Sequence, residues 1–154
     1  MNIKLNLGCG NTILDGYINI DKKSSNTNVM ICDLENALPF DDNSTEYIIA
    51  HHVLEHIINL DNIMHEIYRV CKNGSYIDVI VPMSGTLWAV ADPSHVRQFN
   101  HKTFYYYSEN FITSYDHPQY FRIISQNLER DNDDVFENMV WKVANLHSVL
   151  MVVK

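Results

Sequence analysis

The sequence predicts an α/β fold in which a largely parallel sheet is covered on both faces and ends in an antiparallel edge hairpin. Short apolar runs alternate with polar turns through the first half of the chain. A stripe of apolar residues with helical spacing lies between the last two of these runs, over residues 60–72. Two further apolar runs, 121–128 and 146–153, follow near the end with only a short insert between them. This order of elements predicts parallel strands first and a hairpin last.

Five strands are predicted in the first half. Four are apolar runs closed by Gly, Asp or proline, and the strand before the last runs into "HHVLEHI". They are Ile3–Leu7, Tyr17–Asp21, Val29–Cys32, Tyr47–Ala50 and Tyr76–Val81.

The predicted helix begins at Leu60 and ends at Lys72, with apolar residues at the i, i+3, i+4 and i+7 positions. Asn59 precedes it as an N-cap, and Asn73-Gly74 follows as a stop signal. A second helical stripe is predicted over residues 135–145, where Asp133 or Asp134 is available as a cap.

Size and charge restrict the class of protein. With 154 residues, 46% of them apolar, the chain fits a single domain over residues 1–154. The net charge of −8 argues against a general surface for nucleic acid or for an anionic membrane. No apolar run approaches the roughly 18 residues of a membrane span. The odd set of Cys9, Cys32 and Cys71 contains no CxxC pair, which favours reduced core thiols in a cytoplasmic protein.

Polar or glycine residues follow four predicted strands. They are the Gly-Cys-Gly turn at 8–10, Asp21, Asp33-Leu34, and the histidine pair at 51–52. Because ligands of open α/β sheets bind at the carboxyl ends of the strands, these features are expected to meet in one crevice. This convergence is the main functional signal.

The chemistry of these residues suits a nucleoside cofactor. Gly8 and Gly10 allow positive φ and a close approach of the backbone to a ligand. Asp21 could accept two hydroxyl hydrogen bonds from a ribose, and Asp33 could accept one from an adenine amino group, with Leu34 packed on the ring. The alternative is that Gly-Cys-Gly is only a tight turn and both aspartates are solvated strand ends.

Longer motifs carry a family resemblance. The segments "LNLGCG", "INID", "CDLENALPFDDNSTEYIIAHHVLEHI" and "EIYRVCKNGSYIDVIVP" resemble the class I S-adenosylmethionine-dependent methyltransferases, here with a shortened first crossover. The resemblance covers about residues 3–82. It implies a Rossmann-like, doubly wound sheet of seven strands with the last one antiparallel, and S-adenosyl-L-methionine as cofactor.

The resemblance also implies site residues. The turn of Gly8, Cys9 and Gly10 would wrap the methionine part of the cofactor. Asp21 would bind the ribose, Asp33 with Leu34 the adenine, and His51 would lie beside the cofactor through its side chain or its backbone.

Two departures from the family pattern stand out. Many members have an acidic residue where this chain has Asn6, so a contact of Asn6 with the cofactor's amino group departs from the usual chemistry. The sequence also begins directly at the first strand. The pocket is then expected to be open, or closed by another subunit or by residues 82–120.

Residues 82–120 are predicted to form the acceptor-binding or lid segment, because long loops in compact domains are commonly functional. Within "DPSHVR", His95 is the candidate base or acceptor-positioning residue, with Arg97 and Asp92 beside it. The alternative is that His95 and Arg97 only pin the loop. His52 is expected to face the acceptor.

A metal site is the less favoured interpretation of "HHVLEH". His52 and His56 are spaced i and i+4, which suits two zinc ligands on one helix face. There is no HExxH motif, and no third ligand has a fixed spacing, so no metal is predicted.

The predicted function is therefore S-adenosylmethionine-dependent methyl transfer to a small polar acceptor, with a sugar or glycan precursor as the first guess. The expected partner is that small molecule, and no nucleic acid or membrane partner is expected. A homodimer is one possible assembly. One alternative is a non-catalytic cofactor-binding or interaction module. The other is a nicotinamide-dependent oxidoreductase, which the missing GxGxxG argues against.

Overall fold

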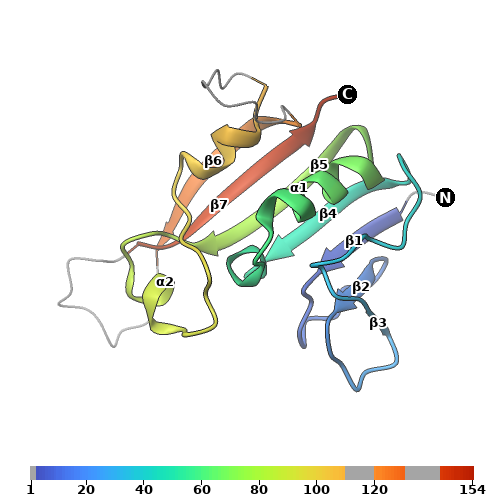
Figure 1. The fold of residues 1–154 in the computed structure, drawn as a ribbon, viewed down its shortest axis with the longest axis horizontal. Coiled ribbons are helices and arrows are strands. Elements are labelled where there is room, and N and C mark those ends of the chain that lie inside the picture. Colours follow the sequence, from blue (N-terminus) through green and yellow to red (C-terminus); the bar gives the residue numbers. More distant parts are fainter. Residues whose placement is uncertain (1–2, 110–119, 131–142) are drawn as a thin grey trace.

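The computed structural model describes residues 3–109, 120–130 and 143–154 (Figure 1). They form one seven-stranded sheet in the order β3-β2-β1-β4-β5-β7-β6. The strands are β1 (Ile3–Leu7), β2 (Ile18–Asp21), β3 (Val29–Ile31), β4 (Thr45–His51), β5 (Cys71–Pro82), β6 (Phe121–Arg130) and β7 (Val143–Val152).

The topology confirms the prediction of a mostly parallel sheet with an antiparallel edge pair. Strands β1 to β5 pair in parallel, and the order reverses between β1 and β4 as in a doubly wound sheet. Strand β7 runs antiparallel to both β5 and β6. The carboxyl ends of β1 to β5 therefore lie at one edge.

One face of the sheet carries the core. Along β4 and β5 every second side chain is buried against the helices, beginning with Ile48 and Ile77, and β1 adds Leu5 and Leu7 to this face. The side chains between them, such as Tyr47 and Asp78, face the other side and are half-buried. This period-2 pattern is that of strands with one fully packed face.

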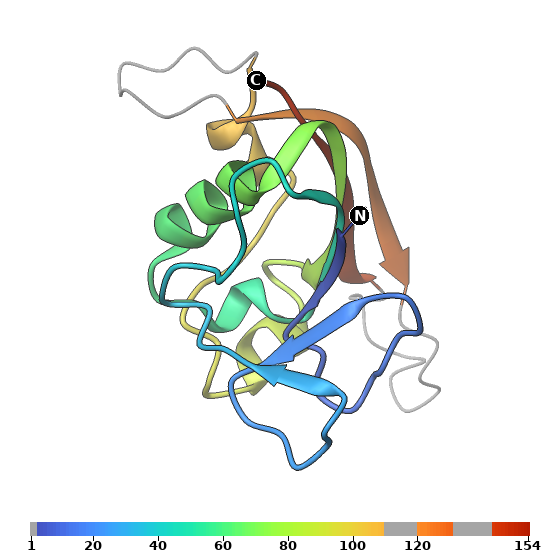
Figure 2. The same ribbon diagram turned by 90° about the vertical axis from the view of Figure 1, so that its right-hand side faces the viewer.

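The helices of the described residues lie on that packed face (Figure 2). They are η1 (Leu54–His56), α1 (Leu60–Val70), α2 (Leu87–Ala91) and η2 (Thr103–Tyr107). The expectation of a sheet covered on both faces is therefore wrong for the described residues. The reason lies in the connections, since the links β1–β2, β2–β3 and β3–β4 contain turns and no helix.

The end of α1 differs from the prediction. Asn59 caps its start by accepting a hydrogen bond from the Asn62 N–H, as expected. The helix ends at Val70, however, and Cys71 already begins β5. Residues 73–74 lie inside that strand, in the register shift between β4 and β5, and Gly74 has a φ of 82°. They form a bulge and do not terminate the helix.

Two predictions concern residues outside the described ranges. Most of the helix expected over 135–145 lies among residues 131–142, and its last three residues belong to β7 instead. Residues 110–119 of the expected lid segment are also not described. The rest of that segment contains α2, which lies beyond the end of β5, and η2, which contacts α1 through Tyr107 and Asp61 (Figure 1).

Two contacts fix the 82–109 segment to the body of the fold. The Val96 N–H donates to the Glu55 carbonyl at 2.9 Å, and the Tyr107 hydroxyl donates to Asp61 of α1 at 2.5 Å. Among the helices of the described residues, none has the length and apolar character that a membrane span requires.

Candidate functional site

The glycine turn follows β1 and lies against the segment that follows β4. Gly8 has a φ of 63°, and a Cβ added there would lie 2.3 Å from Cγ2 of Val53. Gly10 has a φ of 50°, and an added Cβ would meet nothing within 4 Å. Gly8 is thus required for packing, whereas Gly10 borders open space where a ligand can approach the backbone.

Asp21 closes the turn from the second strand. Its Oδ2 accepts a hydrogen bond from the Gly10 N–H at 2.8 Å, and its Oδ1 accepts one from the Lys23 N–H at 3.2 Å. The Cys9 N–H donates to the Ile20 carbonyl at 2.9 Å, which ties the two strand ends together. Each carboxylate oxygen keeps a further lone pair for a ligand hydroxyl.

Asp33 and Leu34 follow β3 and differ in environment. Asp33 Oδ2 lies 2.9 Å from the Lys22 Nζ, and the hydrogen bond from Lys22 lowers the pKa of Asp33. The Leu34 side chain is only 5% exposed and belongs to the core. The predicted stacking of Leu34 on an adenine ring would need a side chain that faces the crevice, so its backbone is the better candidate.

Asn6 is buried and holds the shortened crossover. Its Nδ2 donates to the Thr12 carbonyl and to Asn19 Oδ1, both at 2.9 Å. Asn19 in turn donates to the Leu14 carbonyl at 3.1 Å and accepts from the Leu14 N–H at 3.0 Å. The two amides therefore bind main-chain groups of the crossover at Thr12 and Leu14, a role for which the side-chain amide of Asn6 supplies the donor.

The His51 side chain turns away from the packed face, as does every second residue of β4. Its Nε2 lies 3.3 Å from Asp78 Oδ1, and His147 Nε2 lies 2.7 Å from the same oxygen. His147 also approaches Glu129 at 3.2 Å. At the crevice itself, His51 therefore offers its backbone.

His52 has a φ of 53°, which is rare for a residue other than glycine and is typical of functional sites. Its ring is half-exposed, and its Nδ1 lies 3.6 Å from Glu55 Oε1. The neighbouring Val53 contacts the glycine turn, so His52 lies beside the turn.

Arg97 anchors the loop that follows α2. Its Nε donates to the Ile57 carbonyl at 3.1 Å, and its Nη2 donates to the Ile58 carbonyl at 2.6 Å. These are the contacts of the loop-pinning alternative. His95 makes a contact of the same kind, because its Nδ1 lies 3.3 Å from the Ala89 carbonyl.

Glu55 is not among the predicted site residues. It is 1% exposed, and neither carboxylate oxygen has a hydrogen-bond partner among the residues that the structure describes. The only sequence signal was its place within "HHVLEH". The 92–97 loop lies against it, since the Val96 N–H donates to the Glu55 carbonyl, and no spacing rule reveals this contact.

The thiols do not supply a nucleophile here. Cys9, Cys32 and Cys71 are free, as predicted. Burial raises the pKa of all three thiols, that of Cys71 to about 12, and the charge of Asp21 adds to the effect at Cys9. They are therefore protonated near neutral pH.

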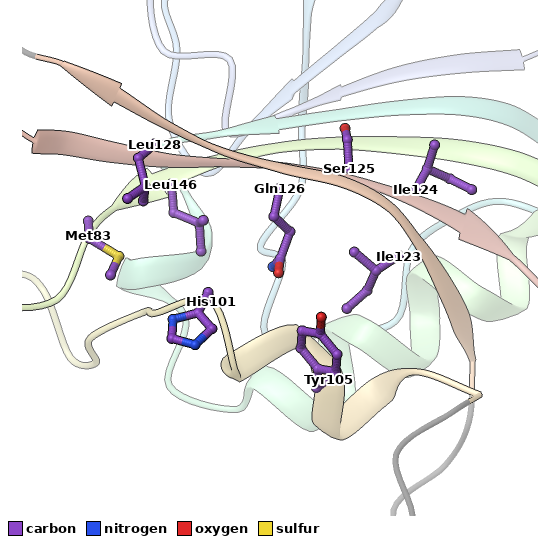
Figure 3. A pocket seen from close by; sticks show the side chains of 9 residues that line it. All are labelled: Met83, His101, Tyr105, Ile123, Ile124, Ser125, Gln126, Leu128 and Leu146. Carbon is purple, nitrogen blue, oxygen red and sulfur yellow. The ribbon is translucent and has the colours of Figure 1, made fainter.

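A cavity of ≈ 530 Å³ lies between β6 and the segment that leads into η2 (Figure 3). Gln126 and Ile123 project from β6 toward His101 and Tyr105 on the facing segment. Its other lining residues are Met83, Ile124, Ser125, Leu128 and Leu146. The volume and the mixture of apolar and polar side chains suit a small molecule. The cavity does not include the predicted residues His52, His95 and Arg97.

Comparisons with known proteins agree with this geometry. Residues 9–79 match the family model described as a methyltransferase domain. No protein with a curated description matches the sequence.

Three solved structures share the fold along nearly the whole chain. A structure of a SAM-dependent methyltransferase from Archaeoglobus fulgidus has a TM-score of 0.69 at 17% identity, over 98% of this chain and 86% of that one. A Haloferax volcanii chain solved with the Trm112 methyltransferase activator also reaches 0.69, at 15% identity over 99% and 83%. The [4+2]-cyclase SpnF reaches 0.65, at 14% identity over 99% and 76%.

At such identities the solved structures establish the fold alone, and the match over residues 9–79 adds a methyltransferase domain model for that segment. The turn, the carboxylate of Asp21 and the sheet order fit a nucleoside cofactor bound across the first two strand ends. Residues 9–79 therefore match a methyltransferase domain, and the whole chain has the fold of solved S-adenosylmethionine-dependent methyltransferases.

Proposed function

We propose that this enzyme methylates a small polar acceptor, for which a sugar or glycan precursor is the first candidate. The observation that carries the proposal is the contact of Gly8 with Val53, which brings the cofactor turn against the histidine-bearing segment 51–56. Acceptor groups held by that segment would lie next to the cofactor.

The cofactor would be held by main-chain and carboxylate groups. Gly8, Cys9 and Gly10 would surround its methionine part, and Asp21 would bind the ribose hydroxyls with the lone pairs left free. Asp33 and the Leu34 backbone would contact the adenine, with the Asp33–Lys22 pair opening to admit it. Asn6 would act indirectly, by holding the shape of the crossover.

The bound sulfonium supplies an activated methyl group, so the protein's task is alignment and proton removal. His52 would face the acceptor beside the turn. His95 would position the acceptor or take its proton, and Arg97 would keep the loop in place through the Ile57 and Ile58 carbonyls.

Titration calorimetry with S-adenosylmethionine, S-adenosylhomocysteine and NAD tests the cofactor assignment. Both sulfur cofactors should bind and NAD should not. Asp21→Asn should weaken binding about tenfold or more, because a hydrogen bond to a charged group contributes about 1.5–3 kcal/mol. Asp15→Asn on the exposed crossover is the matched control and should bind normally. Binding of NAD alone would favour an oxidoreductase.

The acceptor is tested by a panel of sugars and nucleotide sugars. The cavity between β6 and η2 is a second place for the acceptor, separate from segment 51–56, and His101 and Tyr105 face Gln126 across it. If the acceptor binds in this cavity, His101→Ala should raise KM for the acceptor and leave cofactor affinity unchanged; an unchanged KM places the acceptor at segment 51–56. His95→Ala and His52→Ala should instead lower kcat. Unchanged turnover of His95→Ala would exclude a role for His95 as base.

The second candidate is a non-catalytic module that binds the cofactor. The similarity to a cyclase is the reason to keep a function other than methyl transfer, because the same fold there carries a different activity. Tight binding of S-adenosylmethionine without turnover across a broad panel would support it.

Location and assembly are also proposals. Three free thiols favour a reducing, cytoplasmic setting, and the Haloferax volcanii structure, solved with an activator, suggests that a protein partner deserves a test beside the homodimer. Light scattering after size exclusion measures whether the chain alone is a monomer or a dimer.

A further inference from the structure

We propose that Glu55, His56 and His95 form a binding site for a divalent transition metal, with Zn²⁺ as the best-matched ion. Each residue offers one ligand atom, and these atoms all lie within 4.8 Å of one another. This inference goes beyond methyl transfer and does not depend on the cofactor.

The loop after α2 brings the third ligand to the other two. Glu55 and His56 are neighbours in η1, whereas His95 comes from the 92–97 loop. That loop is fixed by the hydrogen bond from the Val96 N–H to the Glu55 carbonyl and by Arg97. The imidazole rings of His56 and His95 meet edge to face, with centroids 4.8 Å apart.

The environment of Glu55 is a second observation, separate from the ligand distances, that favours a bound cation. Its side chain is buried, yet neither oxygen accepts a hydrogen bond from any described residue. The nearest ionisable nitrogen that approaches it outside the cluster is His52 Nδ1, at 3.6 Å. Because burial of an ionised carboxylate without a partner is strongly unfavourable, a bound cation would remove this cost.

Hydrogen bonds around His56 fix which ring nitrogen is free. Ser94 Oγ donates its proton to Asp92 Oδ1 at 2.6 Å, so at its 3.0 Å contact with His56 Nδ1 this oxygen must accept. His56 therefore carries its proton on Nδ1 and keeps a lone pair on Nε2.

His95 has the same arrangement. Its Nδ1 lies 3.3 Å from the Ala89 carbonyl, which can only accept, so its Nε2 also keeps the lone pair. A histidine whose other nitrogen donates to a carbonyl or a carboxylate-linked group is the usual form of a metal ligand. Asp92 Oδ2 lies 3.8 Å from His95 Nε2 and is the nearest additional carboxylate.

Two imidazoles and one carboxylate favour Zn²⁺ over Mg²⁺, which prefers an all-oxygen shell. Zinc bonds of about 2.0–2.1 Å put tetrahedral ligand atoms about 3.3 Å apart, so a modest contraction of the cluster completes the site. Three protein ligands leave one position for water or for an acceptor oxygen. In that case His95 is a metal ligand and does not act as the base.

The test is Zn²⁺ titration of the chelator-treated full chain by calorimetry, with elemental analysis of the dialysed complex. The wild type should bind one Zn²⁺ with a Kd of about 1 µM or below, and Mg²⁺ should not compete. Glu55→Gln and His95→Ala should each weaken binding at least tenfold. His65→Gln, an exposed histidine on α1, should bind like the wild type.

Two further measurements distinguish this site from misfolding of a variant and from thiol coordination. If His95→Ala does not fold, His95→Gln replaces it, and Zn²⁺ should raise the Tm of the wild type but not of Glu55→Gln. Co²⁺ should give tetrahedral d–d bands without a thiolate charge-transfer band. The proposal is overturned if the chain does not bind Zn²⁺, if Glu55→Gln binds it with equal affinity, or if Co²⁺ gives a thiolate band. It is also overturned if only His147→Asn loses the metal, because His147 lies outside the cluster, beside Asp78 and Glu129.

Discussion

Gly8 and Val53 are in closer contact than any side chain at position 8 would allow, and this contact joins the cofactor turn to the segment after β4. An added Cβ would lie 2.3 Å from Cγ2 and 2.6 Å from Cβ of Val53. The relationship couples the stability of the fold to the shape of the site.

Gly8→Ala should therefore unfold at lower denaturant than the wild type. The left-handed φ costs about 1–2 kcal/mol for alanine, and the overlap with Val53 adds about 1–3 kcal/mol. Gly16→Ala, with a φ of 81° and open space around it, is the control for backbone strain alone. Chemical denaturation measures both. Equal losses for the two variants would mean that the contact with Val53 contributes nothing.

Asn6→Asp would restore the acidic residue common in the family, and we expect it to destabilise this chain by about 1–3 kcal/mol. The new carboxylate oxygen would face the Thr12 carbonyl and Asn19 Oδ1, which now accept from the Asn6 amide. Asn73→Asp is the control, because the Asn73 Oδ1 accepts from the Lys154 N–H and an aspartate can do the same. Thermal unfolding of Asn6→Asp at or above the wild-type Tm would contradict this account.

Glu66 should give the fold a pH dependence at the acid end. Hydrogen bonds from Arg69 lower the pKa of this buried carboxyl, with a further contribution from the Leu38 N–H, although burial opposes them. The stabilisation is complete above the unfolded-state pKa of about 4.3 and is lost as the pH falls through the lower folded-state value.

Glu66→Gln should lower the free energy of unfolding at pH 7 by about 2–3 kcal/mol and flatten its decline between neutral and acid pH. Glu66 holds the Arg69 side chain, which also donates to the Leu38 and Phe40 carbonyls. The substitution should therefore also loosen the loop before β4. Urea denaturation across this pH range provides the measurement. An unchanged acid slope would show that other carboxyls dominate.

Tyr107→Phe should loosen the 82–109 segment. The Tyr107 hydroxyl donates to Asp61, and the substitution removes that bond to a charged group at a cost of about 1.5–3 kcal/mol. Tyr76→Phe on the exposed side of β5 is the matched control. Hydrogen exchange should speed up in residues 103–107 and not in the central strands. Unaltered exchange there would exclude Tyr107 as the anchor.

Sequence patterns predicted most elements because local signals suffice for them. The start of α1 follows from Asn59 and the apolar stripe, and β1 matches its predicted bounds. The predicted end of α1 was wrong because an Asn-Gly pair is common both after a helix and in a β-bulge. Only the pairing of β5 with β4 distinguishes the two.

The site shows the same division. The order of the glycine turn and Asp21 along the chain follows from sequence, and their hydrogen bond at 2.8 Å agrees with it. The side-chain environments of Leu34 and His51 did not follow, because they depend on which face of the sheet the helices cover. The contact of Arg97 with the Ile57 and Ile58 carbonyls was one of two alternatives and needed the folded loop.

By itself, the sequence determined the strands, the first helix, the order of polar residues at the strand ends and the family resemblance. These are properties of short segments, whose periodicity and turn residues act locally. Only the tertiary structure decided that the helices of the described residues lie on one sheet face and that His95 lies beside Glu55 and His56. Such relationships join residues far apart in the chain, and they arise from packing of the 92–97 loop on η1, which no local spacing encodes.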